Sequence, residues 1–138
     1  MTVARPTKSG DGRFAYEAAG DPGKTPLVFL HGIGGAARGW RGQLEFFGDR
    51  YLAIAWDMPG YGGSSPLTTV SIATLADALG QFLREFAGSP KPILVGRGLR
   101  GPRNGGTDRC LLVNVEDNVT QFGEKLAWGH AGFGASLR

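Results

Sequence analysis

The sequence predicts an α/β fold in which a parallel sheet is flanked by helices. Three short apolar runs, at residues 27–30, 51–56 and 93–95, are separated by two longer segments with helical periodicity. Continuous apolar runs of this length are typical of parallel strands that are covered on both faces. The β-α-β-α-β order over residues 27–96 therefore predicts a parallel sheet with right-handed crossovers.

The elements before the first helix follow from local patterns. Phe14 and Tyr16 alternate with smaller or polar residues, which predicts an edge strand over residues 13–19. Asp-Pro-Gly at 21–23 marks a turn, and the apolar run 27–30 then forms a buried strand.

Two segments have the spacing of amphipathic helices. Trp40, Leu44 and Phe47 recur at i, i+4 and i+7, which predicts a helix over residues 37–48. In the second helix Ser71 caps the start and Gly88 caps the end. Its apolar face consists of Ile72, Leu75, Leu79, Phe82, Leu83 and Phe86.

The last third of the chain follows a different pattern. Residues 101–106 read Gly-Pro-Arg-Asn-Gly-Gly, a composition that opposes a helix. Residues 110–115 predict one more strand, residues 119–128 a short helix, and the glycine-rich residues 129–138 a loose tail.

Composition places the chain among single-domain globular proteins. It has 138 residues, of which 41% are hydrophobic and 20% charged, and its 24 glycines are well above average usage. The net charge of +3 is concentrated in the last third, where four arginines fall close together: Arg97, Arg100, Arg103 and Arg109. Because no aromatic residues interleave with them, this stretch predicts a solvated loop and no nucleic-acid partner.

Cysteine usage and hydropathy predict a cytoplasmic protein with no membrane partner. The single cysteine, Cys110, excludes an internal disulfide and fits a reducing compartment. Residues 1–8 lack the apolar core of a signal peptide, and no apolar run approaches the ~18 residues that span a membrane.

Two segments together carry a family resemblance. Residues 27–35 read Leu-Val-Phe-Leu-His-Gly-Ile-Gly-Gly, and residues 51–63 read Tyr-Leu-Ala-Ile-Ala-Trp-Asp-Met-Pro-Gly-Tyr-Gly-Gly. They resemble the amino-terminal half of the α/β-hydrolase family, whose members include esterases, lactonases, haloperoxidases and dehalogenases. The resemblance implies one truncated or incomplete α/β-hydrolase domain over residues 1–138. Residues 1–96 are its well-matched βαβαβ core, and residues 97–138 match poorly.

The resemblance assigns the first turn to oxyanion binding. In this family the backbone N–H of the residue after His-Gly points at the developing oxyanion. Here that donor would be the N–H of Ile33, positioned by His31, Gly32 and Gly34. The simpler alternative is a glycine-rich turn between a strand and a helix. His31 is expected to be a packed turn residue, not the catalytic base.

The second segment continues into a loop that matches the family's Asp-x-Pro-Gly-x-Gly-x-Ser. Asp57 begins this loop and Ser64 ends it. The resemblance implies that the loop shapes the floor of the site. Ser64 and Ser65 lie outside any turn from strand to helix, so neither is expected to be a nucleophile.

The nucleophile elbow of the family is disrupted. Residues 95–101 read Val-Gly-Arg-Gly-Leu-Arg-Gly where the family has Val-Gly-His-Ser-Leu-Gly-Gly. Gly98 stands at the serine position and has no side chain that could attack a substrate. Arg97 and Arg100 are further departures, and Leu99 would supply the second oxyanion N–H.

The acid and the base of a catalytic triad have one match each. Residues 114–120 resemble the acid loop and would make Asp117 the orienting acid, although Asn114 stands where the family has glycine. Gly-His at 129–130 would make His130 the base. The alternatives are a solvated loop carboxylate for Asp117 and a tail residue for His130. Cys110 begins a strand and is expected to be a structural thiol.

A different class of function uses the same glycines. Gly96, Gly98 and Gly101 spell G-x-G-x-x-G after a strand, and Asp117 follows about 20 residues later, as a ribose-binding acid would. Such a site needs a helix that begins at the loop. Pro102 and the glycines that follow oppose that helix. A third possibility is a non-catalytic hydrolase fragment, produced by a disrupted reading frame or an internal deletion.

The sequence thus predicts a hydrolase-like chain without its nucleophile. The implied chemistry is hydrolysis of a carboxylic ester, a lactone or a similar small acyl substrate, without a metal or an organic cofactor. Little or no turnover is expected. An uncovered sheet edge would expose unpaired N–H and C=O groups, which predicts self-association.

Overall fold

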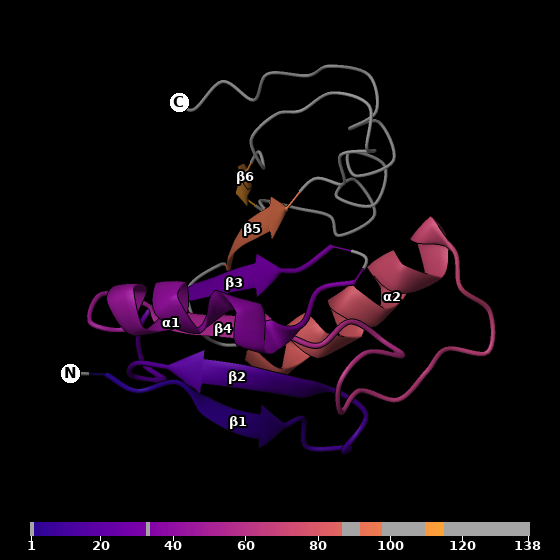
Figure 1. Ribbon diagram of the computed structural model, residues 1–138, viewed down its shortest axis with the longest axis horizontal. Coiled ribbons are helices and arrows are strands. Elements are labelled where there is room, and N and C mark those ends of the chain that lie inside the picture. The colour runs from indigo at the N-terminus through magenta and orange to yellow at the C-terminus, as the bar shows by residue number, and fades with distance from the viewer. Residues whose placement is uncertain (1, 33, 87–91, 98–109, 115–138) are drawn as a thin grey trace.

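The computed structural model describes residues 2–32, 34–86, 92–97 and 110–114. Its strands are β1 (Arg5–Lys8), β2 (Ala15–Ala19), β3 (Pro26–Leu30), β4 (Leu52–Trp56), β5 (Ile93–Arg97) and β6 (Cys110–Asn114). Its helices are α1 (Arg41–Phe47) and α2 (Ile72–Leu83), together with the 3-10 turns η1 (Ala37–Trp40) and η2 (Arg84–Phe86). The six strands form one sheet in the order β1-β2-β4-β3-β5-β6 (Figure 1).

The predicted α/β fold class is confirmed, and the sheet is mixed. β3 runs parallel to both β4 and β5, whereas the pairs β1–β2, β2–β4 and β5–β6 are antiparallel. Parallel neighbours need a crossover long enough to hold a helix. The described chain provides two such crossovers, through α1 and through α2, so the parallel part of the sheet is β4-β3-β5.

The expectation of an edge strand over residues 13–19 is wrong. β2 is paired on both sides, because β1 lies outside it. All four residues of β1 are exposed, so β1 has no apolar alternation that a sequence pattern could reveal. Arg5, Pro6 and Lys8 are residues that discourage further pairing at a sheet edge.

The other outer strand of the described sheet is β6. It pairs with β5 from Ile93↔Asn114 to Arg97↔Cys110, so the outer side of β5 is not open. The strand predicted over residues 110–115 is confirmed at this place. Self-association through a sheet edge stays a prediction.

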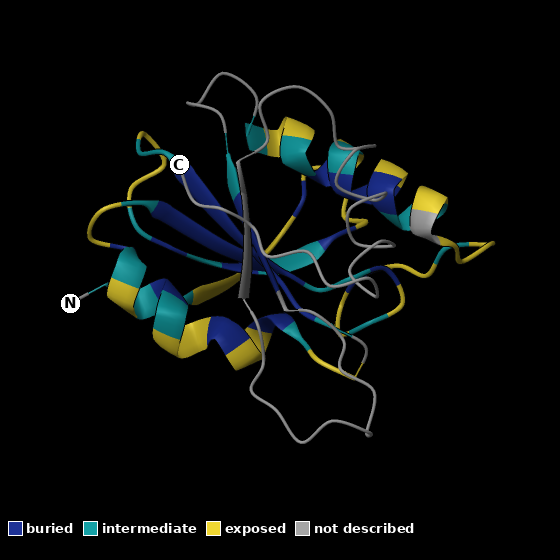
Figure 2. Cartoon of the chain, turned by 90° about the horizontal axis from the view of Figure 1, so that it is seen from above, coloured by how far each residue is buried: buried dark blue, intermediate teal, exposed yellow. Residues whose placement is uncertain are grey.

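Helices cover both faces of the parallel strands. The side chains of β3 alternate, so that Leu27 and Phe29 pack with Trp40 and Leu44 on the α1 side. Val28 and Leu30 pack on the α2 side. Figure 2 shows the buried strands lying between the two helices. The continuous apolar run in the sequence reflects this burial on both faces.

The α2 side of the sheet is dominated by aromatic rings around Phe82, which is 0% exposed. Its ring centroid lies 5.4 to 5.6 Å from the rings of Phe14, Tyr16, Trp56 and Phe86. The contacts join α2 and η2 to β2, β4 and the residue that precedes β2. Offset and edge-to-face ring pairs of this kind stabilise a core beyond the area that they bury.

The start of α2 is confirmed at the predicted cap. The Ser71 hydroxyl accepts a hydrogen bond from the Thr74 N–H at 3.1 Å, and the Thr74 hydroxyl accepts one from the Ser71 N–H at 2.8 Å. This reciprocal pair is a capping box with threonine in the position that glutamate usually holds. The predicted helix over residues 37–48 is also confirmed, with its first turn formed by η1.

Several expectations fall on residues outside the described ranges. They are the cap at Gly88, the helix over residues 119–128 and the tail over residues 129–138. Among the described helices, none combines the length and the apolar character that crossing a membrane requires.

Replacing Phe82 by alanine tests the aromatic core. We expect Phe82→Ala to lower the free energy of unfolding by about 3–5 kcal/mol, because a fully buried ring is lost and a cavity remains. Urea denaturation followed by tryptophan fluorescence measures the change. The matched control is Phe46→Ala, since Phe46 is 74% exposed. Similar losses in the two variants would contradict the packing described here.

Candidate functional site

The candidate site lies where β3 and β5 end side by side. The two strands are parallel, and their last register pair is Leu30↔Gly96. The chain that leaves β3 continues through α1 to β4, on the opposite side of β3 from β5. Ligands of open α/β sheets bind outside the carboxyl ends of the strands, at the point where the strand order reverses. His31 and Gly32 follow directly from β3 at this point.

His31 is a packed turn residue whose two ring nitrogens are both bonded. Its side chain is 8% exposed, and its ring meets that of Tyr61 edge-on at 5.2 Å between centroids. Nε2 accepts a hydrogen bond from the Met58 N–H at 2.9 Å. Because Nε2 accepts, Nδ1 carries the proton and donates it to the Gly32 carbonyl at 2.9 Å. In this arrangement the ring has no free nitrogen that could act as a base.

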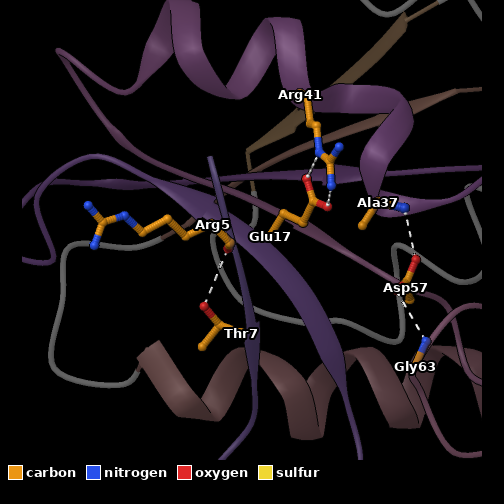
Figure 3. Close-up of polar contacts among 7 residues, drawn as sticks. All are labelled: Arg5, Thr7, Glu17, Ala37, Arg41, Asp57 and Gly63. Atoms are coloured by element: carbon orange, nitrogen blue, oxygen red, sulfur yellow. Dashed lines mark hydrogen bonds and ion pairs between the residues drawn. The ribbon is translucent and has the colours of Figure 1, made fainter. Parts of the chain in front are cut away.

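Asp57, the residue after β4, holds two backbone N–H groups from separate segments. Oδ1 accepts from Ala37 at 2.9 Å, and Oδ2 accepts from Gly63 at 3.4 Å (Figure 3). Gly62 has φ +50°, and a Cβ at this position would overlap the Asp57 carboxylate. The loop can close around the carboxylate because residue 62 is glycine.

The Ser64 hydroxyl has a structural role. It donates to the Asp57 carbonyl at 2.6 Å and accepts from the Ala15 N–H at 2.9 Å, and the side chain is buried. The Asp57 N–H also donates to the Ala15 carbonyl at 2.8 Å. These bonds fasten the loop after β4 to β2. That Ser64 is not a nucleophile stays a prediction.

The turn after β3 depends on glycine at two described positions. Gly34 has φ +81°, a left-handed conformation that strains other residues. Gly35 donates its N–H to the Gly32 carbonyl at 2.9 Å, which closes the turn. A Cβ at Gly35 would lie 2.9 Å from the His31 Cβ, so the turn packs directly against the histidine.

An ion pair next to this region ties the sheet to α1. Arg41 donates to the two carboxylate oxygens of Glu17 at 2.7 and 2.8 Å (Figure 3). Glu17 is buried on β2, whereas the Arg41 side chain is about half exposed. The hydrogen bonds and the charge of Glu17 raise the pKa of the Arg41 guanidinium. Because each charge is satisfied by the other, the pair has a structural role.

The structure brings part of the predicted site together. His31, Gly32 and Gly34 lie in the turn after β3, beside the loop that begins at Asp57. The remaining predicted site residues lie outside the described ranges; they are Ile33, Gly98, Leu99, Gly101, Asp117 and His130.

The first glycine of the dinucleotide-like motif lies within a strand. Gly96 pairs with Leu30 on one side and with Leu111 on the other. A dinucleotide site of that kind needs its first glycine in the tight turn after the strand. The observed pairing therefore does not favour the dinucleotide alternative.

Sequence reasoning missed two participants. Ala37 contributes only its backbone N–H, so its side chain gives no signal. Tyr61 packs on His31, and its aromatic character within a glycine-rich loop was an available signal. Among the described residues, no group of three or more His, Cys, Asp or Glu side chains could hold a metal ion.

Comparison with known proteins identifies related sequences. Residues 25–97 match the sequence model of a family whose description is alpha/beta hydrolase fold. Epoxide hydrolase 3 from Xenopus tropicalis is 34% identical over 119 residues, which cover 86% of this chain and 27% of that protein. The dihydrolipoyllysine-residue acetyltransferase component of the acetoin cleaving system from Cupriavidus necator is 34% identical over 108 residues, which cover 78% of this chain and 27% of that protein.

A solved structure of an epoxide hydrolase has a similar fold over most of this chain. The crystal structure of epoxide hydrolase A from Mycobacterium thermoresistibile superposes with a TM-score of 0.58 at 29% identity. The superposition covers 70% of this chain and 31% of that chain. The chain thus spans less than a third of the length of each of these three relatives.

The role of Ser64 can be tested against its neighbour. We expect Ser64→Ala to lower the free energy of unfolding by about 1–3 kcal/mol, because the Ala15 N–H and the Asp57 carbonyl lose their shared partner. Urea denaturation measures the difference. Ser65→Ala is the matched control, since Ser65 is exposed and its hydroxyl makes no hydrogen bond among the described residues. Equal stability of the two variants would show that the Ser64 bonds do not fasten the loop.

Proposed function

This chain belongs to the α/β-hydrolase fold family, and from this premise we propose that the family chemistry its motifs correspond to is the hydrolysis of a carboxylic ester, a lactone or a similar acyl substrate. We propose further that this chain itself carries out little or no turnover. Acyl transfer in a serine hydrolase needs a nucleophile, a base, an acid and two oxyanion N–H groups. The proposal assigns a residue to each of these roles except the nucleophile.

The observation that carries the proposal is the pairing of Leu30 with Gly96. It puts the residue before His31 beside Gly96, which lies two positions before position 98 in the sequence. In the family, the nucleophile that follows the matching strand lies next to the oxyanion donor of this turn. The residue at position 98 is glycine, which has no hydroxyl, thiol or carboxylate.

The remaining roles are assigned by resemblance to the family. Ile33 and Leu99 would donate the two oxyanion N–H groups, Asp117 would orient the base, and His130 would be the base. In a complete enzyme the base takes the proton from the nucleophile as it attacks the acyl carbon, and later returns a proton to the leaving group. Without a nucleophile the first step of this reaction cannot take place.

The names of the relatives broaden the range of substrates to test. Two of them are called epoxide hydrolases, and one is an acetyltransferase component. An epoxide therefore belongs beside the esters in any activity screen.

We expect the full chain to be catalytically silent. We expect no hydrolysis of p-nitrophenyl acetate, of a simple lactone or of styrene oxide above the rate of the Gly98→Ala variant. We also expect no covalent labelling by a fluorophosphonate probe, because such probes need an activated serine. Intact-protein mass spectrometry measures the labelling. Covalent labelling of the natural chain at any serine would overturn the proposal.

A serine at position 98 tests whether a hydroxyl alone is missing. We expect Gly98→Ser to remain inactive, because Arg100 still places a long cation where the family's elbow has glycine. An active and labelled Gly98→Ser protein beside a silent Gly98→Ala protein would contradict this and show an intact elbow.

Saturable binding of NADH by the natural chain would instead support the dinucleotide alternative and count against the hydrolase assignment.

A further inference from the structure

Two loops at the carboxyl edge of the sheet are joined by two hydrogen bonds, and each loop supplies the side-chain acceptor of one of them. The β3 turn comprises the described residues from His31 to Ala36, and the β4 loop comprises residues 57–64. His31 of the β3 turn accepts from the Met58 N–H of the β4 loop at 2.9 Å. Asp57 of the β4 loop accepts at 2.9 Å from the N–H of Ala37, the residue that directly follows the β3 turn.

The two bonds hold opposite ends of the same turn. His31 fixes the turn where it leaves β3, and Asp57 fixes it where η1 begins. Between these points, the Gly35 N–H donates to the Gly32 carbonyl and closes the turn. If one end were released, the glycines between the two points could adopt other conformations, because glycine has a wide range of accessible φ and ψ values.

The two acceptor side chains, His31 and Asp57, are themselves held in place by packing and by further hydrogen bonds. The β4 loop is fastened to β2 through the buried Ser64 hydroxyl, and its closure around Asp57 uses the left-handed Gly62. His31 is buried, and Gly35 packs against its Cβ. Side chains locked by packing and by hydrogen bonds are the ones that can hold a site in one geometry.

We propose that His31 and Asp57 are positioning residues that hold the β3 turn in one conformation before any substrate binds. What the turn is held for rests on the proposed function: backbone N–H groups stabilise an oxyanion best when they need no rearrangement. The holding itself depends only on the described hydrogen bonds. Neither side chain touches a reacting atom in this scheme, and each acts through the backbone of the turn.

Amide hydrogen exchange measured by NMR on the full chain tests the proposal, with the Gly35 N–H as the reporter. The Gly35 N–H donates to the Gly32 carbonyl, whereas the Asp57 carboxylate accepts from Ala37 and Gly63, so a purely local role of Asp57 would leave the exchange of Gly35 unchanged. In Asp57→Ala we expect faster exchange at Ala37 and Gly63 and, in addition, an increase of about tenfold at Gly35.

Asp57→Asn separates the two bonds of the carboxylate. The asparagine carbonyl still accepts from Ala37, whereas its NH₂ group cannot accept from Gly63. We expect faster exchange at Gly63 alone, with Ala37 and Gly35 unchanged. The matched control is Asp49→Asn, since the Asp49 carboxylate accepts only from Thr2 among the described residues. It should leave Gly35 unchanged.

The hydrogen bond between the Met58 N–H and His31 has its own spectroscopic signature. The ¹⁵N resonances of the His31 ring should show a protonated Nδ1 and an unprotonated Nε2 in the natural chain. His31→Leu removes the acceptor for the Met58 N–H and should also speed exchange at Gly35.

Three results would overturn the proposal. They are unchanged exchange at Gly35 in a folded Asp57→Ala protein, lost protection of Gly35 in Asp57→Asn, and a protonated Nε2 on His31. If Asp57→Ala does not fold, the Asp57→Asn and His31 measurements decide. The outcome is separate from that of the proposed function, because esterase activity in the natural chain would refute catalytic silence without changing any of these exchange rates.

Discussion

The pairing of β3 with a parallel strand on each side is the constraint on which the rest of the structure depends. All five residues of β3 are buried, and their side chains alternate between the two layers that contain α1 and α2. One short strand therefore joins both halves of the hydrophobic core. Because parallel strands end at a common edge, the same pairing also decides which loops meet where β3 ends. The pairing of β3 with its two neighbours thus determines both the packing of the core and the position of the candidate site.

At that edge, polar contacts take over from apolar packing. His31 and Ser64 are buried and Asp57 is half-buried, and each hydrogen-bonds backbone groups of a neighbouring segment. A group of this kind stabilises the fold because it satisfies N–H and C=O groups that would otherwise be buried without partners. The same contacts define the shape of the turn after β3. The side chains that the family motif contributes here, among them His31, Asp57 and Ser64, act as scaffold.

The sequence predicted the parts of the fold whose signal is local. β3, β4 and β5 are short apolar runs, and α2 has both a periodic apolar face and Ser71 at its start. β1 was not predicted, because its exposed residues carry no alternation and its place depends on β2. The direction of β6 could not be predicted either, since strand direction follows from the connections and from pairing, not from residue pattern. In the site, motif residues such as His31 and Asp57 were found, whereas a backbone donor such as Ala37 leaves no trace in the sequence.

The register between β3 and β5 is the most direct test of this account. Backbone proton contacts measured by NMR between the two strands would report it residue by residue in the full chain. We expect contacts that pair Leu30 with Gly96 and Val28 with Leu94. A shift of the pairing by one residue, or an absence of contacts between the strands, would contradict it. Either result would remove the pairing that sets the turn after β3 beside the end of β5.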